Sequence, residues 1–122
     1  IDSVQGISDK IAFTAGVTGR KERAVDYCAA KGIDLRDDFQ ALLDDPELDG
    51  IVLATPHSQH AEQVILAAAA GKPVFCEKPF TLDADDARRA VDAMDGAGLP
   101  LCIGFNRRFL PAMRKLKALP AE

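Results

Sequence analysis

The sequence has no tryptophan, one tyrosine and three cysteines among its 122 residues. The cysteines, Cys28, Cys76 and Cys102, are odd in number, lie far apart and include no CxxC pair. This pattern argues against a disulfide framework or a zinc ribbon, so we expect no metal site and a reducing, cytoplasmic setting. Each cysteine is expected to be a small buried hydrophobic residue, which is the usual place of a free cysteine.

Long apolar runs and an excess of basic residues are also missing. The longest apolar stretch, 64–71, is mostly alanine and falls well short of the roughly 20 residues that span a bilayer. The 19 acidic and 15 basic residues give a formal net charge of −4, which argues against nucleic-acid and membrane partners. The length and the ordinary composition, 48% hydrophobic and 28% charged, predict one domain, 1–122.

Short apolar runs alternate with helical patterns along the chain, and this alternation is typical of βαβ units. The fold class is therefore predicted as α/β, a parallel sheet with helices on both faces. Ser58 and Asp83 are the expected N-caps of two helices, and Gly71 the expected end of the first of these. The predicted strands are 10–15, 50–54, 73–76 and 101–104, and the predicted helices are 19–31, 37–43, 58–71, 84–94 and 111–119, with 1–8 as the end of an earlier helix.

Polar residues follow each predicted strand, where ligands bind in open parallel sheets. Both histidines, His57 and His60, come after the second strand. Lys78, after the third, is well placed to polarise a hydroxyl or carbonyl or to carry a proton, and the alternative is an exposed ion pair with Glu77. His60 is expected in the first turn of a helix, where a structural histidine is the more common outcome.

The turn after the first strand bears on the choice of cofactor. A dinucleotide fold that prefers NAD normally carries an acid that holds the ribose 2′-hydroxyl, but this sequence offers Thr18 and Arg20. A small hydroxyl residue followed by arginine suits a 2′-phosphate, so NADP is favoured over NAD. The alternative is that Arg20 is a surface residue of the following helix.

Two motifs in this order, ATPHSQH at 54–60 and EKPF at 77–80, resemble the Gfo/Idh/MocA family of oxidoreductases. The surrounding stretch GKPVFCEKPF at 71–80 is the most specific part, and GFNRRF at 104–109 supports the match. The resemblance extends over about 10–117. It implies a Rossmann domain that binds NAD or NADP, followed in the intact enzyme by an α/β substrate domain.

The resemblance also implies roles for individual residues. Lys78 would be the catalytic residue, reaching between nicotinamide and substrate as the proton relay or hydroxyl-binding group. His60 would support the turn that precedes it, and Glu77 would lie near the nicotinamide ribose. The remaining cofactor-binding residues would be Thr55, Pro56 and His57 along the dinucleotide, with Asn106 and Arg107 at the edge of the nicotinamide and substrate site.

The sequence departs from the family pattern in one respect. A Rossmann fold begins with a strand and a GxGxxG turn that binds pyrophosphate, but Gly16 and Gly19 do not have this spacing. We therefore expect the chain to be an interior portion of a longer enzyme. The resemblance implies that this enzyme is homo-oligomeric and transfers hydride between NAD(P) and a secondary alcohol or carbonyl of a sugar or polyol. The alternatives are a non-catalytic nucleotide-fold fragment or binding module, and a hydrolase of the same family that retains its NAD.

Overall fold

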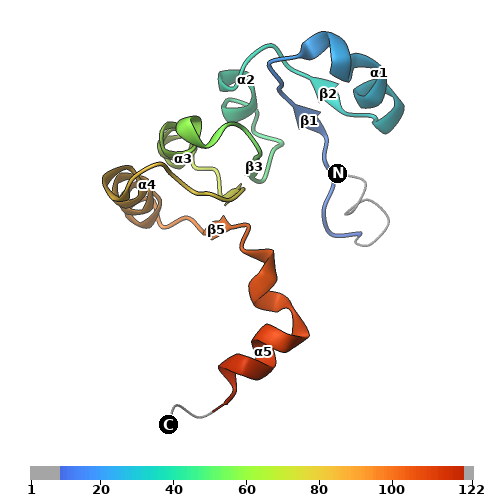
Figure 1. The fold of residues 1–122 in the computed structure, drawn as a ribbon. Coiled ribbons are helices and arrows are strands. Elements are labelled where there is room, and N and C mark those ends of the chain that lie inside the picture. The colour runs from blue at the N-terminus through green and yellow to red at the C-terminus, as the bar shows by residue number, and fades with distance from the viewer. Residues whose placement is uncertain (1–8, 120–122) are drawn as a thin grey trace. The chain divides into compact units, whose positions relative to one another are not determined.

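The computed structural model describes residues 9–119, and the helix expected for 1–8 lies outside them (Figure 1). The chain divides into two compact units, Ile1–Asp49 and Gly50–Glu122, each with its own parallel sheet. The α/β class and the parallel pairing predicted from the alternating pattern are confirmed.

The first unit is built on a short βαβ segment. Strand β1 (Ala15–Gly16) pairs in parallel with β2 (Asp34–Leu35), and helix α1 (Lys21–Lys31) connects them. The helix ends where Gly32 adopts a φ of 67°, which is a glycine-favouring left-handed conformation, and the backbone N–H of Ile33 then bonds to the carbonyl of Cys28. Strand β1 is much shorter than the predicted strand 10–15, since it contains only Ala15 of that range together with Gly16. Strand β2 has no apolar run in the sequence and was not predicted.

Residues 37–49, which follow β2, are rich in aspartate, and Arg36 forms an ion pair with one of these aspartates. Helix α2 (Gln40–Leu43) is shorter than the predicted 37–43, and the Asp38 carboxylate accepts a hydrogen bond of 2.9 Å from the N–H of Ala41. Arg36 donates from Nη2 to the Asp45 carboxylate at 2.7 Å. This partly buried ion pair connects the two ends of the stretch, because it joins the residue after β2 to the turn that precedes Pro46.

The second unit contains a three-stranded parallel sheet in the order β3-β4-β5. Ile51 pairs with Val74 and Val74 with Leu101, so the three strands are in register and their carboxyl ends meet at one edge. The elements of this unit in chain order are β3 (Ile51–Leu53), η1 (His57–Gln59), α3 (His60–Ala69), β4 (Val74–Cys76), α4 (Ala84–Gly96), β5 (Leu101–Ile103), η2 (Asn106–Phe109) and α5 (Pro111–Lys117).

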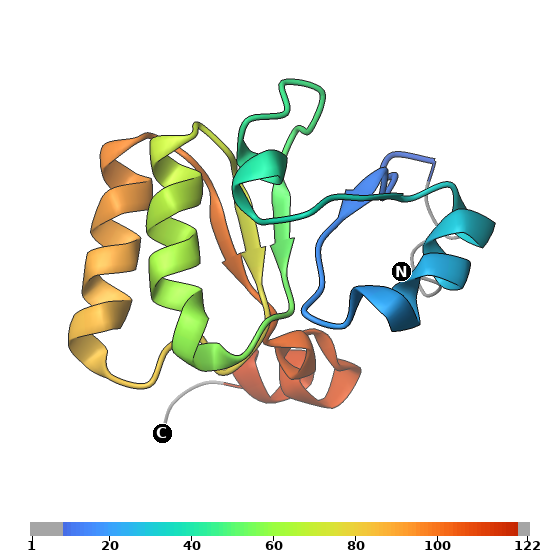
Figure 2. The same cartoon turned by 90° about the horizontal axis from the view of Figure 1, so that it is seen from above.

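Helices α3 and α4 lie side by side against the same face of this sheet (Figure 2). The alternating side chains of the strands divide accordingly. Those on the helix side are buried in β3 and β4 and half-buried in β5, and those on the other side are exposed. Val52 is 53% exposed, although its neighbours Ile51 and Leu53 are buried. The core of the second unit consists mainly of Ile51, Leu53, Ala61, Val64, Ala67, Ala68, Val74, Cys76, Ala90 and Met94.

The helix termini test the predicted caps. Asp83 caps α4 as predicted, because its carboxylate accepts a hydrogen bond of 2.9 Å from the N–H of Asp86. Ser58 does not cap α3, since it lies inside the 3₁₀ turn η1 that precedes this helix. Gly71, with a φ of 73°, follows the end of α3. No helix among residues 9–119 is both long and apolar enough to cross a membrane.

The cysteines differ from one another in burial. Cys28 and Cys76 are buried as predicted, but Cys102 is exposed, so this part of the prediction is wrong. The reason is the alternation along β5, which directs Cys102 to the face of the sheet that α3 and α4 do not cover. Its register partner Phe75 lies on the same face and is 39% exposed.

Candidate functional site

The candidate site is the carboxyl edge of the three-stranded sheet. Backbone pairing continues one residue past the strands, because Glu77 donates its N–H to Leu53 and Gly104 donates to Cys76, both at 2.9 Å. The turn after β4 is therefore flanked by the turns after β3 and β5. The sequence predicted this gathering of polar turns from the parallel pattern, and the structure brings them together within the second unit.

The turn after β3 is held by a side chain that the sequence analysis did not select. The Thr55 hydroxyl donates a hydrogen bond of 2.5 Å to Oε1 of Gln63, one turn into α3. Gln63 in turn donates from Nε2 to Oε1 of Gln59 at 3.4 Å. The spacing of Gln59 and Gln63 by four residues, which places them on one helix face, was the available signal. Pro56 and His57 are exposed in this turn, and His57 begins η1.

His60 lies beneath the turns after β3 and β4 and is 2% exposed. Its Nε2 is 2.9 Å from the carbonyl oxygen of Thr55, and its Nδ1 is 3.1 Å and 3.0 Å from the carbonyl oxygens of Pro79 and Phe80. This first residue of α3 therefore connects the turn that contains Thr55 with the turn that contains Lys78. The prediction of a structural histidine agrees with this burial and with these contacts.

The turn after β4 contains Glu77, Lys78 and a cis peptide bond between Lys78 and Pro79. The Glu77 carboxylate accepts the backbone N–H of Lys78 at 3.0 Å. The Lys78 ammonium, in contrast, is exposed and makes no ion pair within residues 9–119. The alternative of a Glu77–Lys78 ion pair is therefore not observed, and the ammonium remains available to a ligand.

Glycine at position 104 lets the Glu77 carboxylate lie close to the backbone of the turn after β5. A Cβ built at Gly104 would be 3.3 Å from Oε2 of Glu77 and 3.4 Å from Oε1. Any side chain here would therefore displace the carboxylate. Gly104 is the first residue of the GFNRRF motif, but only the tertiary structure shows that the Glu77 carboxylate lies against it.

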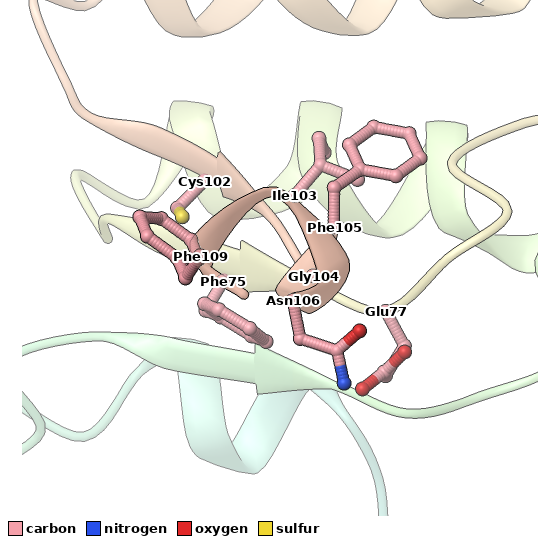
Figure 3. A pocket seen from close by; sticks show the side chains of 8 residues that line it. All are labelled: Phe75, Glu77, Cys102, Ile103, Gly104, Phe105, Asn106 and Phe109. Atoms are coloured by element: carbon pink, nitrogen blue, oxygen red, sulfur yellow. The ribbon is translucent and has the colours of Figure 1, made fainter. Parts of the chain in front are cut away.

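A pocket of about 150 Å³ opens between the turns after β4 and β5. Its walls are mostly aromatic and aliphatic, and its polar groups are the Glu77 carboxylate and the Asn106 amide. In Figure 3, Phe75, Cys102 and Phe109 lie on one side of the pocket, and Asn106 and Glu77 lie on the other. The exposed middle positions of β4 and β5 supply Phe75 and Cys102, of which Cys102 was expected to be buried.

The predicted residues differ in their relation to this pocket. Asn106 lines it, whereas Arg107 is exposed in η2 and does not. Thr18 and Arg20 belong to the first unit, where the hydroxyl of Thr18 accepts a hydrogen bond of 3.3 Å from the backbone N–H of Arg20 at the start of α1. Both are exposed, so the Thr18 turn presents a hydroxyl and a guanidinium to solvent.

Cys76, the last residue of β4, is buried at this edge of the sheet. Cys76 Sγ lies 3.4 Å from the carbonyl oxygen of Glu77, and its side chain has no exposed surface. Burial, together with the negative charge of Glu77, raises the pKa of Cys76 to about 11. A thiol that stays protonated at neutral pH is a poor nucleophile, so Cys76 is a structural residue.

Polar turns gathered at the carboxyl edge of a parallel sheet place a candidate ligand site where open α/β proteins bind their ligands. Comparison with known families makes this assignment specific. The chain belongs to the Gfo/Idh/MocA oxidoreductase family with an NAD-binding Rossmann fold, whose family model matches residues 2–105. The resemblance seen in the two sequence motifs is thereby confirmed.

Individual relatives agree with this assignment. The chain is 46% identical to an inositol 2-dehydrogenase of Paracoccus denitrificans over 87 residues, which are 70% of this chain and 26% of that protein. It superposes on a "probable dehydrogenase" from Thermotoga maritima with a TM-score of 0.84 and 31% identity, covering 94% of this chain and 35% of that one. A 3-ketoreductase from Actinomadura kijaniata, crystallised with NADP and TDP-benzene, gives a TM-score of 0.82 at 29% identity, with 90% and 34% covered. The chain thus spans about a quarter to a third of the proteins it matches.

Proposed function

We propose that this chain is the nucleotide-binding portion of an NAD(P)-dependent oxidoreductase that interconverts a secondary alcohol and a carbonyl on a sugar or polyol. The two units are, in this proposal, parts of one Rossmann domain. The observation that carries it is Lys78, which follows the central strand of the sheet and whose backbone is held on both sides. Its ammonium is exposed and has no ion pair among residues 9–119. Family membership and the inositol dehydrogenase relative support the substrate class.

The residues present fit a nicotinamide nucleotide in their chemistry. Glu77 offers a carboxylate that can accept hydrogen bonds from ribose hydroxyls, and Asn106 offers an amide that can donate and accept. The apolar walls of the adjoining pocket suit the face of a flat ring. When bound, the nicotinamide supplies the hydride acceptor for oxidation or the hydride donor for reduction.

The chain's own part in the reaction is positioning and proton transfer. In oxidation, the Nζ of Lys78 in its neutral amine form takes the proton of the substrate hydroxyl and becomes an ammonium, while the O–H electron pair forms the second C–O bond and the C–H bond releases its hydride. In reduction, the same Nζ returns that proton to the carbonyl oxygen. Glu77 fixes the backbone N–H of Lys78, and His60 fixes the carbonyl of the next residue, Pro79, so the base of the lysine is held while its end remains free.

Thr18 and Arg20 are proposed to bind the far end of the dinucleotide. A guanidinium pairs well with a phosphate, and this supports a preference for NADP over NAD. The NADP-bound relative agrees with use of this cofactor in the family, and the family description names NAD. Homo-oligomeric assembly of the intact protein stays a prediction.

The test is a steady-state absorbance assay of the full-length protein with both cofactors and a panel of inositols, aldoses and their keto derivatives. We expect production of free NAD(P)H with at least one secondary alcohol. Cofactor binding without any net change in absorbance across the panel would contradict the oxidoreductase proposal. That result would favour a binding module or an enzyme that retains and recycles its cofactor, which product analysis would distinguish.

A further inference from the structure

The buried ring of His60 is surrounded by hydrogen-bond acceptors of one kind. Nε2 faces the carbonyl oxygen of Thr55 at 2.9 Å, and Nδ1 faces those of Pro79 and Phe80 at 3.1 Å and 3.0 Å. The side chain is 2% exposed, so water does not provide an alternative set of partners. The ring therefore has backbone carbonyls at both nitrogens.

A carbonyl oxygen only accepts hydrogen bonds, and a neutral imidazole carries a single N–H. A neutral ring would therefore bond to one of the two turns and direct a nitrogen lone pair at a carbonyl of the other. Only the doubly protonated ring donates to both sides, with the N–H on Nδ1 shared between Pro79 and Phe80. The hydroxyl of Thr55 does not relieve this conflict, because it donates to Gln63.

We infer that His60 is a positioning residue that acts as an imidazolium, donating from both ring nitrogens to hold the Thr55 turn and the Lys78–Pro79 turn together. The cationic ring would then connect the predicted dinucleotide contact at Thr55 to the proton carrier at Lys78. The catalytic consequence rests on the proposed function, whereas the protonation state and the connection between the turns do not. Loss of one proton would release one of the two turns.

No carboxylate bonds to the ring within the part of the chain that the structure describes. The segments packed around it carry few charges, and most are exposed. His57 and Glu62 belong to η1 and α3, Cys76, Glu77 and Lys78 to the end of β4 and its turn, and Asp83 to the start of α4. Only Cys76 among these is buried, and it is a neutral thiol. Among residues 9–119, the positive charge therefore meets three carbonyl dipoles and no counter-ion in direct contact.

The first experiment is a ¹⁵N NMR titration of the ring in the full-length protein, without substrate, with the signals assigned from the His60→Gln variant. We expect two protonated ring nitrogens, and on raising the pH a transition to one N–H. The backbone amides of His57 and Phe80 should shift with the same midpoint. The exposed Glu62→Gln variant is the matched control and should leave this titration in place.

A ring that carries one N–H throughout the pH range in which the protein is folded would overturn the inference. The inference would also be overturned if the backbone amide signals of His57 and Phe80 did not shift when the ring changes its protonation state. Because the measurement needs no turnover, its outcome is independent of whether the oxidoreductase proposal holds.

The second experiment compares the kinetics of the wild type, His60→Gln and His60→Ala. Misplacement of Lys78 should lower kcat by roughly 10²-fold in His60→Ala, since small displacements of a catalytic group cost about this much. Glutamine can donate from its amide nitrogen to one of the two turns, so kcat of His60→Gln should lie between those of His60→Ala and the wild type. In the wild type, kcat should fall as the ring loses its second proton, and the variants should lack this pH dependence. Equal pH profiles in all three proteins would show that the His60 proton has no catalytic role.

Discussion

The hydroxyl of Thr55 and the side-chain carbonyl of Gln63 are 2.5 Å apart, which ties the turn after β3 to the second turn of α3. We expect Thr55→Val, which keeps the shape of the side chain, and Gln63→Met each to lower the free energy of unfolding by about 1 kcal/mol. The double variant should cost less than the sum, with a coupling of about 0.5–1.5 kcal/mol from the lost bond. Urea unfolding of the four proteins measures this cycle.

Gln59→Ala is the control for this cycle. Its bond to Gln63 is long, 3.4 Å, and exposed, so its removal should change stability by less than about 0.5 kcal/mol. A strictly additive double variant would mean that the Thr55–Gln63 bond contributes nothing to the turn.

Lys78 is expected to matter for turnover and not for cofactor affinity. In Lys78→Ala, kcat should fall by about 10²–10⁴-fold because proton transfer loses its carrier, while the Kd of NAD(P) changes little. Lys78→Arg keeps the charge but holds its proton far more strongly, so it should not restore turnover. Rapid kinetics together with fluorescence titration of the cofactor separates the two quantities. Unchanged kcat in the alanine variant would remove Lys78 from the mechanism.

A substitution at Gly104 tests whether the close approach of the Glu77 carboxylate to the backbone of Gly104 matters. In Gly104→Ala the new Cβ would be 3.3 Å from Oε2 of Glu77, so the carboxylate must move and its bond to the N–H of Lys78 weakens. We expect a loss of about 0.5–1.5 kcal/mol in stability and weaker cofactor binding. A crystal structure of the variant would show the displaced carboxylate.

Gly96→Ala is the matched control for this substitution. A Cβ at Gly96 would meet nothing within 4 Å, and the residue ends α4. Alanine there should be neutral or should stabilise the protein by up to about 1 kcal/mol. An equal loss of cofactor affinity in both variants would argue against a specific role for the Gly104–Glu77 approach.

Arg20 bears on the choice of cofactor. If its guanidinium pairs with a 2′-phosphate, Arg20→Ala should weaken NADP by about tenfold or more and leave NAD unchanged, since a hydrogen bond to a charged group contributes about 1.5–3 kcal/mol. Thr18→Ala should give a smaller change in the same direction. Titration of both cofactors against both variants measures the ratio. Equal losses for NAD and NADP would place Arg20 elsewhere on the dinucleotide or would reflect a change in fold.

Cys76 should resist modification as long as the protein is folded. Its pKa, raised from 9.0 to about 11, leaves almost no thiolate at about pH 8. A maleimide at this pH should modify Cys76 only after unfolding, as read by peptide mass spectrometry, with Cys76→Ala to confirm the peptide.

The same shift has a consequence for stability. Because the folded-state pKa lies above the unfolded value, the unfolded chain ionises first, and stability should fall as the pH rises between about 9 and about 11. The Cys76→Ala variant should lack this part of the alkaline loss. An identical slope in both proteins would contradict the assignment.

Much of the fold could be predicted because its signals are local. The apolar runs that became β3, β4 and β5, the helix cap at Asp83 and the glycine after α3 depend on neighbouring residues alone. Strand β2 could not be found, since its two residues, Asp34 and Leu35, carry no apolar pattern and are extended only because they pair with β1. Ser58 was misassigned as a cap because a 3₁₀ turn intervenes before α3.

The sequence by itself determined the class of the protein, because the order of strands, helices and polar turns and the two motifs are properties of the linear chain. Only the tertiary structure decided which atoms meet at the candidate site. The Thr55–Gln63 bond, the three carbonyls around His60, the approach of Glu77 to Gly104 and the exposure of Cys102 each depend on segments that are distant in the chain or on the face that a strand side chain occupies. Such contacts depend on strand register and helix packing, and a linear pattern of residue types does not encode the distances that these two features set.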